Sequence, residues 1–126
     1  MTTQDALNWF EIPVHDLERA QHFYEVLLDI SMRREVMAGQ MLAIFPHAQG
    51  RPGGALVSGS MAAAPSTDGC VVYLDAGTSL DATLARAGEL GAKVLMSKVQ
   101  LPADIGAIAH VADSEGNRIG LHSPTA

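Results

Sequence analysis

The chain has 126 residues, a formal net charge of −6 and 48% hydrophobic residues. This length suits one domain with its own core, and the hydrophobic content argues against disorder. Nucleic-acid binding needs clustered basic side chains, and the sequence offers one basic pair, Arg33–Arg34. No apolar stretch approaches the ~20 residues that cross a bilayer. We therefore expect no nucleic-acid partner and no membrane partner.

A single cysteine, Cys70, excludes an intrachain disulfide and fits a reducing compartment. Cys70 begins an apolar run, and no basic residue adjoins it, so we expect a buried and inert thiol. Residues 1–8 lack the basic region followed by an apolar region that marks a signal peptide. These features predict a cytoplasmic protein.

The first half predicts one strand, one helix and three further strands. Residues 9–14 are aromatic and then β-branched, which favours a strand. Asp16 is a good N-cap for a helix whose apolar residues recur at helical spacing and which ends near Asp29. Three strand-like runs follow, separated by turns rich in glycine and proline, at 30–37, 41–45 and 55–58.

The second half repeats this order. Residues 70–74 predict a strand, and Thr78 with Asp81 forms a capping box for a helix that Gly91 ends. Three more strands are predicted at 93–96, 105–111 and 118–121, with a turn at 113–117 between the last two.

The order β-α-β-β-β therefore occurs twice within one domain, residues 1–126. We place a first module at 7–60, a linker at 61–68 and a second module at 69–123. A repeat that cannot close its own core should pair with its twin. Two such half-sheets curve into an incomplete barrel with helices outside and a concave face, here called the cup, which suits a small molecule. The predicted fold class is α+β.

Several strings, taken in order, resemble the vicinal oxygen chelate superfamily, the glyoxalase/bleomycin resistance/dioxygenase group. The resemblance covers nearly the whole chain and is nearest to the glyoxalase-like branch related to lactoylglutathione lyase. It implies two paired β-α-β-β-β modules, often assembled as a homodimer. The matching strings lie at 9–20, 23–24, 53–57, 72–74, 90–94, 105–109 and 113–121.

The same resemblance indicates where members with metal chemistry carry their ligands. Matching the strings places those four positions at Trp9, Ala55, Val71 and Gly120. None of these side chains can coordinate zinc, nickel or iron. We therefore expect neither a metal nor another cofactor, and not the metal-dependent glyoxalase or dioxygenase chemistry of the group. A non-standard ligand set remains the alternative.

Alternation along the strands assigns candidate site residues to the cup. The opposite faces carry Phe10, Ile12, Val72, Leu74, Ile119 and Leu121, which suit a helix-covered core. Each candidate also has a structural interpretation: a bonded carboxylate for Glu11, a packing residue for Tyr73, a core side chain for His110 and a partly exposed side chain for His122. The predicted ligand-binding set is Trp9, Glu11, Tyr73, His110, Arg118 and His122, with Asp75 on the same face.

Three functions remain open from the sequence. The first is binding of a small organic molecule in the cup without the usual metal. The second is a lyase or isomerase in which Glu11 is the base and His122 or His110 its partner, because a desolvated carboxylate and an imidazole both exchange protons near neutral pH. The third is an interaction module whose cup is closed by packing.

Overall fold

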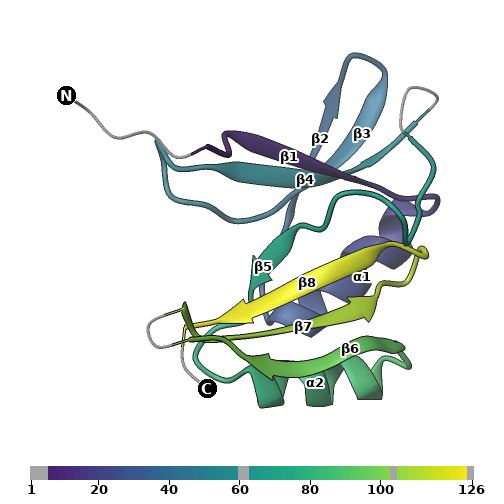
Figure 1. Cartoon of the computed structure of the whole chain (residues 1–126). Coiled ribbons are helices and arrows are strands. Elements are labelled where there is room, and N and C mark those ends of the chain that lie inside the picture. The colour runs from purple at the N-terminus through teal and green to yellow at the C-terminus, as the bar shows by residue number, and fades with distance from the viewer. Residues whose placement is uncertain (1–5, 60–62, 103–104, 125–126) are drawn as a thin grey trace.

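The computed structural model describes residues 6–59, 63–102 and 105–124 and contains both repeats (Figure 1). Each half has one strand, one helix and three strands, as predicted. The elements of the first half are β1 (Trp9–Pro13), α1 (Leu17–Leu28), β2 (Arg33–Met37), β3 (Gln40–Ile44) and β4 (Gly53–Ser58). Those of the second half are β5 (Tyr73–Asp75), α2 (Leu80–Glu89), β6 (Val94–Gln100), β7 (Ala107–Ala112) and β8 (Arg118–Ser123).

The strands form two four-stranded mixed sheets, ordered β1-β4-β3-β2 and β5-β8-β7-β6. The first strand of each half is parallel to the last, and the other pairs are antiparallel. In Figure 1, β5 lies at the edge of the second sheet that is turned toward β4 and β1. The α+β class is confirmed, and the two sheets do not close into a barrel.

One hydrophobic core joins the two halves on the helix-covered faces of both sheets. The predicted inward set is confirmed: Ile12, Leu74, Ile119 and Leu121 belong to this core, and Phe10 and Val72 pack against it. Helix α1 packs on β3 and β4, α2 packs on β7 and β8, and the helices contact each other. The opposite face of each sheet carries no helix and is called here the helix-free face.

Several local predictions are confirmed and others are wrong. Asp16 caps α1 by accepting a hydrogen bond from Arg19 N–H at 3.0 Å. The cap of α2 is Ser79, whose hydroxyl accepts from Ala82 N–H, and not Thr78. The strand predicted at 70–74 begins only at Tyr73, because residues 70–72 are extended but do not pair along a full ladder. Cys70 is exposed, so the prediction of a buried thiol is wrong.

A turn at residues 113–117, between β7 and β8, holds the two halves together. The Glu115 carboxylate accepts hydrogen bonds from the backbone N–H groups of His15 and Asp16, both at 2.9 Å, and pairs with Arg19 at 2.7 Å. The carboxylate therefore satisfies backbone N–H groups at the start of α1 that have no partner within the helix. Burial alone would raise the pKa of Glu115, but the bonds from Arg19 and the backbone outweigh it and lower the pKa to about 2.

Asp113 lies at the centre of the same turn and is buried. Its carboxylate accepts a 2.5 Å hydrogen bond from the hydroxyl of the fully buried Tyr24. It also accepts bonds from the backbone N–H groups of Glu115 and Asn117 and from the Asn117 side chain. Burial, then the Asp113 charge, raises the pKa of Tyr24, so the tyrosine stays a donor. Asn117 also donates to Pro13 C=O and so extends the contact to β1.

The segment between the halves runs beside the second sheet where it is described. Ser66 C=O accepts a hydrogen bond from Arg118 N–H, and Val72 C=O accepts one from Gly120 N–H. Residues 60–62, where the first module is predicted to end and the linker to begin, lie outside the described residues. Within the described ranges, no helix has the length and apolar character needed to span a bilayer.

Candidate functional site

The helix-free face of the first sheet carries Trp9 and Glu11. Trp9 lies opposite Gly53 and Glu11 opposite Ala55 in the β1–β4 register, so both side chains project from this face. Trp9 is 41% exposed, and its indole N–H donates to Glu11 Oε2 at 3.3 Å. The His47 ring meets the indole edge-on at a centroid distance of 6.4 Å. A polar, open site results, because Glu11 is exposed rather than desolvated.

The helix-free face of the second sheet carries a line of three hydrogen-bonded side chains from three strands. The Tyr73 hydroxyl lies 2.6 Å from His110 Nε2, and Arg118 Nη1 lies 3.0 Å from His110 Nδ1. The register explains the contact, since Tyr73 and His110 both lie opposite Gly120, on its two sides. Burial, and then the charge of Arg118, lowers the pKa of His110, so its imidazole is neutral at pH 7.

His122 and Asp75 share that face but bond elsewhere. His122 Nε2 donates to Ile105 C=O at 2.5 Å, which requires the proton on that nitrogen. Asp75 Oδ1 accepts from Gly77 N–H at 2.8 Å and so fixes the bend that leads into α2. Both residues therefore have structural partners beside any role toward a ligand.

The predicted site residues thus form two groups. Trp9 and Glu11 contact each other, and His110 contacts both Tyr73 and Arg118. In the part of the chain that the structure describes, no hydrogen bond or ion pair joins Glu11 to His122 or His110. The acid–base pairing of Glu11 with either histidine stays a prediction.

The residues at the four metal positions implied by the resemblance do not fit a metal. Trp9, Ala55 and Gly120 offer no donor atom, and Val71 lies before β5 begins. The ring of Tyr73 also covers Gly120: a Cβ built there would lie 2.4 Å from the ring. A longer ligand side chain at position 120 would have to displace that ring. Among the described residues, no three His, Cys, Asp or Glu side chains gather as a metal site requires.

The close approach of Tyr73 to Gly120 gives a testable prediction. Gly120→Ala should destabilise the protein by about 1–2 kcal/mol, because the added methyl group forces the ring off its position. Equilibrium urea unfolding measures this change. In a Tyr73→Ala background the same substitution should be neutral or stabilising by up to about 1 kcal/mol, since alanine suits a strand better than glycine. An equal cost in both backgrounds would contradict the contact.

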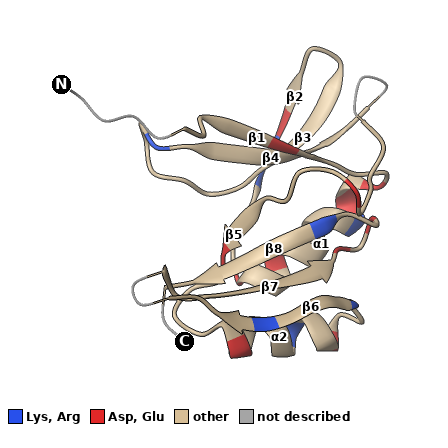
Figure 2. Cartoon of the chain, in the orientation of Figure 1, with Lys and Arg blue, Asp and Glu red and all other residues tan. Residues whose placement is uncertain are grey.

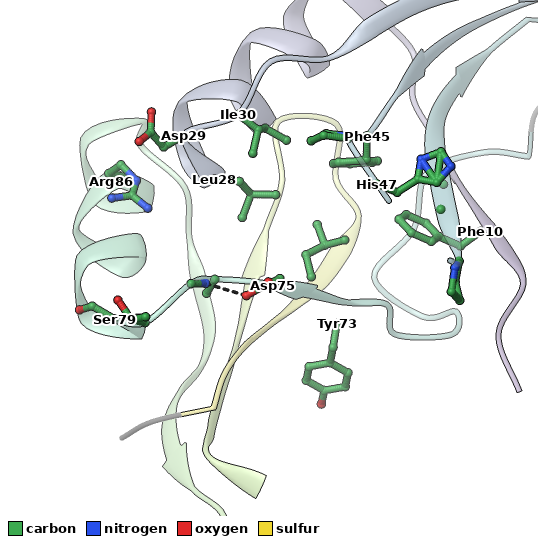
Figure 3. A pocket seen from close by; sticks show the side chains of 18 of the residues that line it. Phe10, Leu28, Asp29, Ile30, Phe45, His47, Tyr73, Asp75, Ser79 and Arg86 are labelled. Carbon is green, nitrogen blue, oxygen red and sulfur yellow. Dashed lines mark hydrogen bonds between the residues drawn. The ribbon is translucent and has the colours of Figure 1, made fainter. Parts of the chain in front are cut away.

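Sequence reasoning missed a cavity of about 640 Å³ where the two halves meet on the helix-covered side (Figure 3). The end of α1, the start of α2 and the facing ends of β4 and β5 surround it. Its volume lies within the range of ligand pockets. Much of its wall is apolar and is formed by Phe10, Leu28, Ile30, Phe45 and Leu74. Asp75 and Arg86 supply charged groups to the wall. Figure 3 shows the Tyr73 hydroxyl pointing away from these side chains.

Charged residues are interspersed over both halves (Figure 2). The register places Glu11, Arg33 and Glu35 on the helix-free face of the first sheet, and Asp75 and Arg118 on that of the second. Arg118 uses one guanidinium nitrogen for His110 and approaches Thr67 C=O with Nε at 3.4 Å. It is half-buried, so its charge acts on its neighbours in a partly dry environment.

Comparison with known proteins agrees with this architecture. A family model described as bleomycin resistance protein-like N-terminal matches residues 7–28, which include β1 and α1. A glyoxylase/bleomycin resistance protein/dioxygenase domain from Frankia sp. EAN1pec superposes with a TM-score of 0.72 at 18% identity, over 97% of this chain and 99% of that one. The chain has the glyoxalase/bleomycin resistance/dioxygenase fold. The fold that the sequence resemblance implies is thereby confirmed.

Other proteins of this fold are similar over almost their whole length. TnmS3, an antibiotic-binding protein from Streptomyces sp. CB03234, gives a TM-score of 0.68 at 23% identity, covering 99% of this chain and all of that one. A glyoxalase family protein from Bacillus cereus gives 0.71 at 16% identity, covering 99% and 97%. No curated protein matches the sequence. At these identities the similarity establishes the glyoxalase/bleomycin resistance/dioxygenase fold, and any activity has to be inferred from the site residues.

Proposed function

We propose that this protein binds a small, planar organic molecule on the helix-free faces of its sheets, without the usual metal of the fold. The observation that carries the proposal is the placement of two half-exposed aromatic side chains there, Trp9 at 41% and Tyr73 at 45% exposure. Tyrosine and tryptophan combine an apolar ring with a polar tip, and both are enriched where a protein contacts another molecule. TnmS3, which has the same fold, is an antibiotic-binding protein, and this supports a small organic ligand here.

The surroundings of both aromatic side chains suit such a ligand. On the first sheet, a second apolar cluster lies next to Glu11 and consists of the buried side chains of Leu42, Ile44, Ala55 and Val57. On the second sheet, His110 and Arg118 place hydrogen-bonding groups next to Tyr73. Apolar and aromatic surroundings with a few fixed polar groups are the usual composition of a small-molecule site.

A homodimer is part of the proposal. The β2–β3 hairpin exposes Val36 at 71%, Met37 at 56% and Met41 at 43%, and such a cluster of apolar side chains favours contact with a second copy. Sedimentation at several concentrations should give twice the mass of the chain, and Val36→Glu should shift the species toward the monomer. A monomer at all concentrations would contradict this part of the proposal.

Trp9 makes the binding directly measurable, because it is the only tryptophan of the chain. A panel of metabolites and antibiotics is screened by thermal shift with and without EDTA, and each compound that raises the melting temperature is titrated while Trp9 emission is recorded. We expect EDTA-independent binding that changes this emission. Trp9→Ala should weaken binding about tenfold or more by calorimetry, as removal of a central aromatic contact does.

The cavity on the helix-covered side supplies the matched control. Ala82 lines that cavity from α2 and is exposed, so Ala82→Phe fills space there, whereas Trp9 is not among the residues that line it. Binding that survives Ala82→Phe and is lost in Trp9→Ala supports the proposed site. The reverse pattern would place the ligand in the cavity, and the absence of any stabilising compound would contradict the binding function.

A further inference from the structure

In the hydrogen-bonded line Arg118–His110–Tyr73, the chemistry of the side chains determines which group donates each hydrogen bond. A guanidinium group only donates hydrogen bonds. His110 Nδ1, at 3.0 Å from Arg118 Nη1, must therefore present its lone pair and carry no proton. In a neutral imidazole the proton then resides on Nε2, which faces the Tyr73 oxygen at 2.6 Å.

The surroundings of His110 agree with a neutral ring. The groups that face it are Arg118 from β8, Tyr73 from β5 and Met96, its partner on β6, with Gly120 opposite. No carboxylate among the described residues bonds to it, whereas a cation does. Burial and this cation both lower the pKa of His110 and so disfavour the doubly protonated form.

The Tyr73 oxygen thus accepts a proton from His110, and its own O–H must find another acceptor. Within the described residues, His110 is the only hydrogen-bond partner of the hydroxyl. Tyr73 is 45% exposed, and its hydroxyl points away from the cavity side chains (Figure 3). A hydroxyl that accepts one hydrogen bond becomes a better donor in the next.

We propose that Tyr73 is a specificity-determining donor that selects planar ligands bearing a conjugated carbonyl oxygen, with Arg118 and His110 as the residues that orient its proton outward. This inference rests on the proposed small-molecule function and narrows its ligand class. Because Arg118 and His110 direct the tyrosine proton outward, a ligand with a carbonyl oxygen at this position accepts a hydrogen bond that a ligand without such an oxygen cannot form.

The first experiment reads the direction of the line without any ligand. Nitrogen-15 NMR of the imidazole rings distinguishes protonated from unprotonated ring nitrogens, and a His110→Gln variant assigns the signals among the five histidines. We expect His110 with Nε2 protonated and Nδ1 unprotonated at pH 7. In Arg118→Met this preference should be lost. A proton on Nδ1 in the unmodified protein would overturn the inference.

The second experiment tests ligand choice with a matched pair of rigid, planar compounds. 9-Fluorenone carries a conjugated carbonyl group, and fluorene has the same ring system without it. We expect fluorenone to bind roughly 3- to 10-fold more tightly than fluorene, as one neutral hydrogen bond implies. Tyr73→Phe should abolish this difference, so that the two compounds bind equally tightly. The carbonyl stretching band of bound fluorenone should lie lower in the unmodified protein than in Tyr73→Phe.

The outcomes separate this inference from the proposed function. Equal binding of both compounds, or a carbonyl band that Tyr73→Phe leaves in place, overturns the inference while small-molecule binding stands. Binding of neither compound overturns the stated ligand class, and the screen with Trp9 emission then decides the proposed function separately. Tighter binding of fluorenone that depends on Tyr73 but persists in Arg118→Met would retain the donor and overturn the orienting role of Arg118.

Discussion

Asp113→Ala is expected to destabilise the protein by about 3–5 kcal/mol, a large share of the stability of a domain of this size. The carboxylate accepts four hydrogen bonds, from Tyr24, Asn117 and two backbone N–H groups. Alanine removes all four and leaves the Tyr24 hydroxyl, which is fully buried, without its acceptor. Each buried group left without a partner costs about 1–3 kcal/mol.

Urea unfolding followed by circular dichroism measures this loss, and the melting temperature should fall by about 10–20 °C. Asp81→Ala is the matched control, because Asp81 is exposed and pairs with Lys98 at the surface, where ion pairs contribute little. Tyr24→Phe should cost less than Asp113→Ala and add little to it when both are combined. Similar stability of the Asp113 and Asp81 variants would show that the turn does not hold the halves together.

The second expected effect concerns Glu115 and its dependence on pH. The pKa of this carboxyl falls from its usual 4.5 to about 2 in the folded protein. A difference of this size corresponds to about 3 kcal/mol, and we reduce it to about 2 kcal/mol because the Arg19 side chain is 54% exposed and water screens the pair. Glu115→Gln should therefore be less stable than the unmodified protein by about 2 kcal/mol at pH 7.

The sign of the pH dependence follows from the lowered pKa. Above pH 4.5 the carboxyl is ionised in both the folded and the unfolded chain, and its stabilising effect is complete. As the pH falls from 4.5 toward 2, the unfolded chain takes up the proton first, and the advantage is lost. The gap between the unmodified protein and Glu115→Gln should close over this interval. Glu18→Gln, on the exposed first turn of α1, should show no such convergence; a constant gap for Glu115→Gln would refute the assignment.

Much of the fold was predictable because strands and helix caps carry short-range signals. In β8, Ile119 and Leu121 alternate with Arg118, Gly120 and His122, and this period of two separated the faces once the resemblance had placed Gly120 in the cup. The Asp16 cap followed from one residue type before an apolar helical pattern. The same rules placed Trp9 and Tyr73 on helix-free faces before any contact was known.

The errors arose where several local signals agree with more than one structure. Residues 70–72 are apolar and extended but pair with β8 only through Val72, so the strand starts later and Cys70 is exposed. Thr78 and Ser79 are adjacent capping residues, and in the structure it is the Ser79 hydroxyl that accepts from Ala82 N–H. The cavity lies between the end of α1 and the start of α2, about 50 positions apart in the chain, and no local sequence pattern predicts that these segments are close in space.

The turn at 113–117 also has a consequence for the order of folding. Its bonds to His15, Asp16 and Tyr24 span 100, 99 and 89 positions of the chain, and that to Pro13 spans 104. Closing such long loops costs more entropy than pairing neighbouring strands, so these contacts should form after each half has its own hairpins. Changes in the turn would then accelerate unfolding and leave the folding rate nearly unchanged. The lifetime of the folded state thus depends on the long-range contacts of this turn, which form last.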